Sequence, residues 1–132
     1  MYRAVLDASA LVAILRRESG AADVIEWLRG AVVSSVNVAE VLWTMDKRGA
    51  DRNQVEADLR QMHFRELPFT REDAEIVARL QPLTLGSSVG FAERSCMALA
   101  FRHGVPAITG DREWLKHDVG VEIKLFRNRE AA

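Results

Sequence analysis

The chain has little cysteine, histidine or lysine, and it has no long apolar segment. Among its 132 residues Cys96 is the only cysteine, which excludes an internal disulfide and favours a reducing, cytoplasmic setting. No stretch approaches the roughly 18–20 apolar residues that cross a bilayer, and the apolar run at the start is too short for a signal peptide. No pair of His or Cys residues has zinc-site spacing. We therefore expect a protein with no membrane segment, disulfide or zinc site.

Positive and negative charges nearly cancel, with a formal net charge of −1. Fifteen of the 18 basic residues are arginine, and guanidinium binds phosphate in a bidentate geometry that ammonium lacks. A GC-rich coding sequence accounts for the same bias equally well. Charge therefore leaves nucleic-acid binding open.

Short β-like runs alternate with helix-like stretches along the chain. The pattern predicts strands at 3–7, 31–35, 64–67, 105–109 and 121–126, and helices at 9–17, 21–29, 37–49, 51–62, 70–80, 91–103 and 111–116. Asn37 and Asp51 are predicted as helix caps, and Thr70 with Asp73 as a capping box. The alternation predicts a single α/β domain over residues 1–132, with a mainly parallel sheet and a frayed tail at 127–132.

Four acids fall near one edge of the predicted sheet. Asp7 ends the first strand, Asp111 follows the strand 105–109, and Glu40 and Glu93 lie in the first turns of two helices. Ligands of parallel sheets bind beyond the carboxyl ends of the strands. Four carboxylates repel one another at pH 7 unless a cation is present, and hard oxygen ligands suit Mg²⁺ or Mn²⁺. The sequence thus predicts a metal site that could activate water against a phosphodiester.

Each acid also has a plainer interpretation. Asp7 and Asp111 could be only helix caps, Glu93 could offset a helix dipole, and Glu40 could be a solvated carboxylate on a helix face. The shared position at one sheet edge favours the joint site.

Neighbouring polar residues could assist that site. Ser9 and Thr109 are small hydroxyls that could orient ligands or waters. Arg16, Arg94 and Arg112 lie near the acids in sequence and could contact RNA phosphates, although surface ion pairs are an equally good interpretation.

Four segments resemble, in order, the motifs of PIN-domain nucleases: residues 5–11, 35–41, 91–100 and 106–114. The length resembles the VapC branch, the toxin half of bacterial toxin–antitoxin pairs. The resemblance implies a Rossmann-like α/β/α sandwich and a Mg²⁺- or Mn²⁺-dependent endoribonuclease that leaves a 5′-phosphate and a 3′-hydroxyl. It also implies a homodimer and a cognate antitoxin that covers the active groove.

One residue departs from the family pattern, because the third acid is normally Asp and here it is Glu93. The longer side chain could bind the metal directly, bind it through water, or shift it, and Asp118 could take its place. A second function therefore stays open, that of a PIN-like module that binds RNA or protein without cutting.

Two other classes of protein with acids at a sheet edge are disfavoured. Haloacid-dehalogenase-like phosphatases need a second Asp where this chain has Ser9. Response-regulator receivers need an acid pair near the first strand, which the Leu6–Asp7 step does not offer.

Overall fold

The computed structural model describes residues 1–126, so the tail predicted at 127–132 lies outside the described residues. The elements, in chain order, are β1 (Ala4–Leu6), α1 (Ala8–Leu15), α2 (Ala21–Trp27), β2 (Ala31–Ser34), α3 (Ser35–Lys47), α4 (Arg52–Met62), β3 (Arg65–Leu67), α5 (Arg71–Leu80), the 3₁₀ turn η1 (Pro82–Thr84), α6 (Phe91–His103), β4 (Ala107–Thr109), the 3₁₀ helix η2 (Arg112–Lys116) and β5 (Ile123–Leu125).

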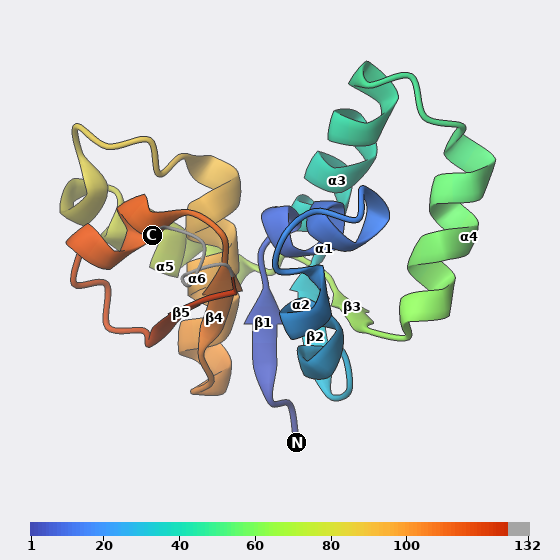
Figure 1. Cartoon of the computed structure of the whole chain (residues 1–132). Helices are drawn as coiled ribbons and strands as arrows, with labels where there is room; N and C mark the ends of the chain where they lie inside the picture. The colour runs from blue at the N-terminus through green and yellow to red at the C-terminus, as the bar shows by residue number, and fades with distance from the viewer. Residues whose placement is uncertain (127–132) are drawn as a thin grey trace.

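The five strands form one parallel sheet in the order β3-β2-β1-β4-β5. Val5 of β1 lies at the centre, in register with Val32 on one side and Ala107 on the other. The strands run side by side through the middle of the molecule, with helices on both faces (Figure 1). The predicted α/β/α sandwich with a parallel sheet is therefore confirmed.

Two apolar cores lie on opposite faces of the sheet, because successive strand side chains point to opposite sides. Leu6 faces a core with side chains of α1, α2, α3 and α4. Val5, its neighbour, faces a second core with side chains of α5, α6 and η2, including the fully buried Trp114. Burial on both faces explains why the central strands are continuous apolar runs, with no alternation of polar and apolar residues.

The structure corrects one predicted helix cap. Ser34 caps α3, because its Oγ accepts a hydrogen bond from the backbone N–H of Val36 at 3.2 Å. Asn37, predicted as the cap, lies inside the first turn and is fully buried. Asn and Ser both favour caps, and Ser34 takes this role because it directly ends β2. The predicted cap at Asp51 is confirmed.

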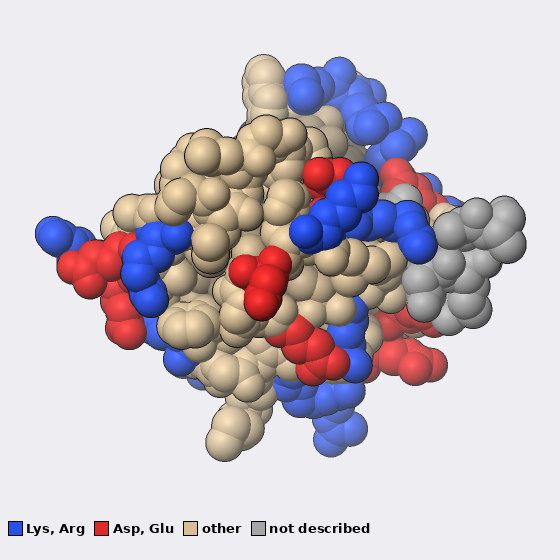
Figure 2. Space-filling view, turned by 90° about the vertical axis from the view of Figure 1, so that its left-hand side faces the viewer, with Lys and Arg blue, Asp and Glu red and all other residues tan. Residues whose placement is uncertain are grey.

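Charged side chains do not form a field of one sign on the face seen in Figure 2. Lys and Arg lie among Asp and Glu around a broad area that carries neither. Leu83, Leu85 and Leu115 are among the large apolar side chains that are exposed. Among the described helices, none has the length and apolarity needed to cross a bilayer.

A buried ion pair joins α5 to α6. Thr70 and Asp73 form the predicted capping box at the start of α5. Asp73, only 2% exposed, also accepts two hydrogen bonds from the guanidinium of Arg102 on α6, at 2.7 and 3.2 Å. A buried carboxylate paired in this way becomes costly when its partner is removed.

We expect Asp73→Asn to lower the free energy of unfolding by about 3 kcal/mol, because the partly buried Arg102 charge loses its partner and the buried contact between α5 and α6 is broken. Urea denaturation would measure this. Glu75→Gln is the matched control, because the Arg71–Glu75 pair on the same helix is exposed and should contribute less than about 0.5 kcal/mol. Equal losses in both variants would contradict the assignment.

Candidate functional site

The sheet order reverses between β1 and β4, and the site lies at that point. β2 and β3 lie in chain order on one side of β1, whereas β4 and β5 lie on the other side of β1. Asp7 directly follows β1, and Thr109 ends β4. Crevices at such a reversal, beyond the carboxyl ends of the strands, are where parallel α/β sheets bind ligands.

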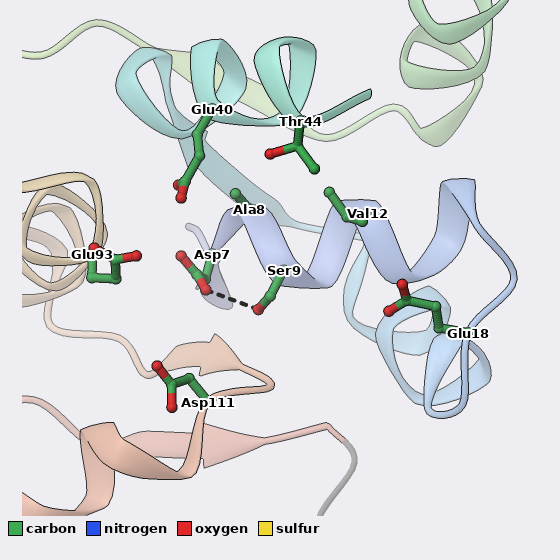
Figure 3. Close-up of a pocket in the computed structure, with 9 residues that line it drawn as sticks. All are labelled: Asp7, Ala8, Ser9, Val12, Glu18, Glu40, Thr44, Glu93 and Asp111. Atoms are coloured by element: carbon green, nitrogen blue, oxygen red, sulfur yellow. Dashed lines mark hydrogen bonds between the residues drawn. The ribbon is translucent and has the colours of Figure 1, made fainter. Parts of the chain in front are cut away.

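A pocket of about 260 Å³ opens there. All four acids predicted from the sequence line it. Figure 3 shows Glu40 entering from α3, Glu93 from α6 and Asp111 from the turn after β4, all around Asp7. The complete lining is Asp7, Ala8, Ser9, Val12, Glu18, Glu40, Thr44, Glu93 and Asp111.

Two hydroxyls fix the carboxylate of Asp7. Its Oδ2 accepts hydrogen bonds from Ser9 Oγ at 2.8 Å and from Thr109 Oγ1 at 3.0 Å. The same hydroxyls accept from the backbone N–H groups of Gly110 and Asp111, both at 3.1 Å. Each hydroxyl therefore links a backbone N–H group of the turn after β4 to the Asp7 carboxylate.

The other oxygen of Asp7 is left without a partner. Asp7 holds the N-cap position of α1, yet its side chain makes no capping hydrogen bond. Its Oδ1 is buried and has no hydrogen-bond partner among the described residues. An unpaired buried carboxylate oxygen is costly, so the plain reading of Asp7 as a cap does not explain it.

Asp111 and Glu93 also each have one oxygen fixed by their own helix. Asp111 caps η2, where its Oδ1 accepts from the backbone N–H of Glu113 at 2.9 Å. Glu93 Oε1 accepts from the backbone N–H of Gly90 at 2.9 Å, the capping-box contact at the start of α6. In each of these two acids, one carboxylate oxygen thus serves the start of a helix, as the plainer interpretation expected. The side chains of both still line the pocket.

Glu40 is half-buried, and its Oε1 is a buried atom with no hydrogen-bond partner among residues 1–126. Burial raises its pKa to about 7, the charges of Asp7 and Glu93 add to the rise, and the Asn37 amide opposes it. A solvated carboxylate on a helix face would keep its ordinary value, so that plain reading of Glu40 is wrong.

Burial also raises the pKa of Asp7, to about 6. The hydrogen bonds from Ser9 and Thr109 oppose this rise, and the charge of Glu93 adds to it. Asp7, which is buried, and Glu40, which is half-buried, thus resist ionisation near one another. A bound cation would remove this conflict.

The donor set fits a hard divalent cation, because every polar side chain in the pocket offers oxygen. The two unpaired buried oxygens, Asp7 Oδ1 and Glu40 Oε1, are the strongest sign of fit. In the described part of the chain, no three His, Cys, Asp or Glu side chains are already gathered as a metal site. The carboxylates line one pocket but are not gathered closely around a single point.

Two polar residues of the pocket were not expected from the sequence. Thr44 lies one turn after Glu40 on α3, and this spacing of four residues could have identified it. Glu18 follows α1 after Arg17, whose φ of 55° turns the chain; no sequence signal marks that turn. Asp118, the alternative to Glu93, does not line the pocket, and its Oδ1 accepts from the backbone N–H of Gly120 at 3.3 Å.

The three arginines have different surroundings. Arg16 forms an ion pair at 2.9 Å with Glu18, at the edge of the pocket. Arg94 donates to the backbone oxygen of Val89 at 2.8 Å, and its Nε is buried. Arg112 is exposed beside Asp111. Contacts of these side chains with RNA phosphates stay a prediction.

Comparison with protein families gives one match, in which the model of the PIN domain fits residues 4–120. The sequence matches no curated protein closely enough to count as a relative.

Several solved structures share the fold. VapBC2 from Rickettsia felis, bound to a promoter DNA fragment, has a TM-score of 0.73 at 15% identity, covering 92% of this chain and 97% of that one. DNA-bound VapBC from Salmonella typhimurium has a TM-score of 0.72 at 18% identity, covering 96% and 99%. VapC20 from Mycobacterium tuberculosis, a toxin that cleaves the sarcin–ricin loop, has a TM-score of 0.63 at 14% identity, covering 79% and 86%. At these identities the likeness establishes the fold.

The buried carboxyls predict how stability depends on pH in EDTA. The folded state holds the Asp7 proton up to about pH 6, whereas the ordinary pKa is 3.8. Folded protein therefore binds more protons than unfolded protein between these values, and the free energy of unfolding should fall as pH rises through this window. The contribution of Asp7 is about 3 kcal/mol at most.

Urea denaturation of wild type and Asp7→Asn in EDTA at pH 4 and pH 7 would measure this contribution. In Asp7→Asn the neutral amide does not titrate, so the free energy of unfolding should fall much less between pH 4 and pH 7 than it does in wild type. Asp51→Asn, which changes an exposed capping acid outside the pocket, should keep the wild-type dependence. The same pH dependence in all three proteins would refute the burial argument for Asp7.

Proposed function

The chain belongs to the PIN domain family, and from that premise we propose that it is a metal-dependent endoribonuclease, the toxin of a toxin–antitoxin pair. The observation that supports this most directly is the pocket with four acids, in which Asp7 Oδ1 and Glu40 Oε1 are buried without partners. Such oxygens call for a cation, and Mg²⁺ or Mn²⁺ is the kind that carboxylates and water bind.

Asp7 and Asp111 would be the principal ligands, with Glu93 and Glu40 completing the site. When bound, Mg²⁺ or Mn²⁺ would supply a Lewis acid that activates water and neutralises charge on the phosphodiester. The hydroxyls of Ser9 and Thr109 hold Oδ2 of Asp7 in place, so that Oδ1 stays directed into the pocket. Glu40, with a pKa raised to about 7, would hold a proton in the metal-free protein and release it as the site fills.

The reaction would be hydrolysis of an RNA phosphodiester. An oxygen of water forms a bond to phosphorus, and the bond from phosphorus to the 3′ oxygen breaks. The products would carry a 5′-phosphate and a 3′-hydroxyl. Arg16 at the pocket edge and the exposed Arg112 would contact neighbouring phosphates.

Partners would include a cognate antitoxin and a second copy of this chain. The antitoxin is supported by the VapBC structures with this fold that are bound to DNA, and the second copy follows from the family resemblance alone. The antitoxin would cover the acid pocket and exclude RNA from it.

Cleavage of single-stranded RNA tests the proposal. We expect cutting with Mg²⁺ or Mn²⁺ and none in EDTA, with 5′-phosphate ends on the products. Asp7→Asn should reduce the rate at least ~100-fold, because it replaces a charged ligand of the cation, while the variant stays folded by circular dichroism. Binding of RNA equally with and without metal, and no cutting under any condition, would instead favour the binding-module function.

Glu93, the acid that departs from the family pattern, gives a separate test of the proposed site. Glu93→Gln should reduce cleavage by about 10- to 100-fold, because the pocket loses a negative oxygen. Asp118→Asn is the matched control and should cleave at the wild-type rate, since Asp118 does not line the pocket. The reverse pattern would show that Asp118 has replaced Glu93 in the site.

A further inference from the structure

Asn37 is a fully buried polar residue between the two helices that deliver Glu40 and Glu93. It lies on α3, three residues before Glu40. Its Nδ2 donates a hydrogen bond across to the backbone oxygen of Ala92 on α6, at 2.9 Å. Ala92 directly precedes Glu93, so this bond joins the backbone beside one acid to the helix that carries the other.

The orientation of the Asn37 amide follows from its partner. A backbone carbonyl can only accept, so the NH₂ group must face Ala92. The amide also interacts with the Glu40 carboxylate, which it stabilises in the charged form. A single side chain thus contacts α6 and an acid of the pocket.

Keeping an amide here has a cost. The Oδ1 of Asn37 is buried and has no hydrogen-bond partner within residues 1–126. An unpaired buried oxygen destabilises the fold, and an apolar side chain at this place would avoid that cost. The bond to Ala92 and the contact with Glu40 therefore point to a role at the site.

Repulsion within the pocket explains what such a bond could do. Once Glu40 is ionised, Glu40 and Glu93 carry like charges, and they come from α3 and α6, which pack directly against each other. Electrostatic repulsion favours separation of these helices near their first turns. A hydrogen bond at that level opposes the separation.

We propose that Asn37 is a positioning residue that fixes the distance between Glu40 and Glu93 and so prepares the pocket to bind a divalent cation. This inference rests on the proposed function, because it assumes that the four acids bind a metal. Residues that orient metal ligands in other proteins change metal affinity by about 10- to 100-fold when they are replaced.

Direct Mn²⁺ binding by isothermal titration calorimetry tests the inference without an activity assay. We expect Asn37→Ala to bind Mn²⁺ at least ~10-fold more weakly than wild type. Ser95→Ala is the matched control. Ser95 is equally buried and donates to the backbone oxygen of Phe91 at 2.9 Å within α6 itself. That variant should bind Mn²⁺ within about twofold of wild type, because its hydrogen bond does not join the two helices.

Asn37→Asp distinguishes a positioning role from an effect of charge alone. It also keeps the shape of the side chain, so it serves as the second variant if Asn37→Ala fails to fold. An added carboxylate by itself would strengthen cation binding by Coulomb attraction. Binding is measured at about pH 8, above the raised pKa expected of a buried carboxyl, where the introduced group is ionised and cannot donate to Ala92. The proposal therefore requires weaker binding in this variant too. The Mn²⁺ concentration for half-maximal RNA cleavage should rise by the same factor, with the KM for RNA at saturating Mn²⁺ unchanged.

The outcomes distinguish this inference from the proposed function. Mn²⁺ binding equal to or tighter than wild type in Asn37→Asp would overturn the role of Asn37, and the proposed nuclease would stand. A similar loss of affinity in Ser95→Ala would also overturn it, because any buried polar contact of α6 would then suffice. Absence of Mn²⁺ binding by wild type would overturn the metal-dependent nuclease itself.

Discussion

The constraint that the rest of the site depends on is negative charge gathered in a poorly solvated pocket. Burial raises the pKa of Asp7 to about 6 and that of Glu40 to about 7. Such carboxyls destabilise the folded protein as they ionise, so a chain without use for the cluster would gain stability by losing it. Each of the two groups has an unpaired buried oxygen, and a bound cation would satisfy both.

In three of the four acids, the fold holds one carboxylate oxygen with hydrogen bonds and leaves the other oxygen free to face the pocket. Hydroxyls of Ser9 and Thr109 fix Asp7, the start of η2 fixes Asp111, and the start of α6 fixes Glu93. Two of these devices are ordinary helix caps. The hydrogen bonds that cap η2 and α6 therefore also fix the positions of Asp111 and Glu93 in the pocket. These two acids have a structural role and a proposed functional role at the same time.

Sheet topology decides where the acids meet. The reversal of strand order beside β1 opens a crevice, and α3 and α6 approach it from different segments of the chain (Figures 1 and 3). Solved structures with only 14–18% identity share this fold. A fold can persist at such identity because many apolar side chains satisfy the same buried positions. The longer side chain of Glu93 is accommodated because its own helix holds one of its oxygens.

The sequence by itself determined the alternation of strands and helices, the parallel sheet and the position of Asp7, because these follow from local periodicity and from residues next to strand ends. It also indicated all four acids through their motifs. Only the tertiary structure decided that Asn37 joins α3 to α6 instead of capping a helix, that Glu40 is half-buried, and that Thr44 enters the pocket. The physical reason is that burial and contacts between distant segments depend on how the helices pack, which no local pattern encodes.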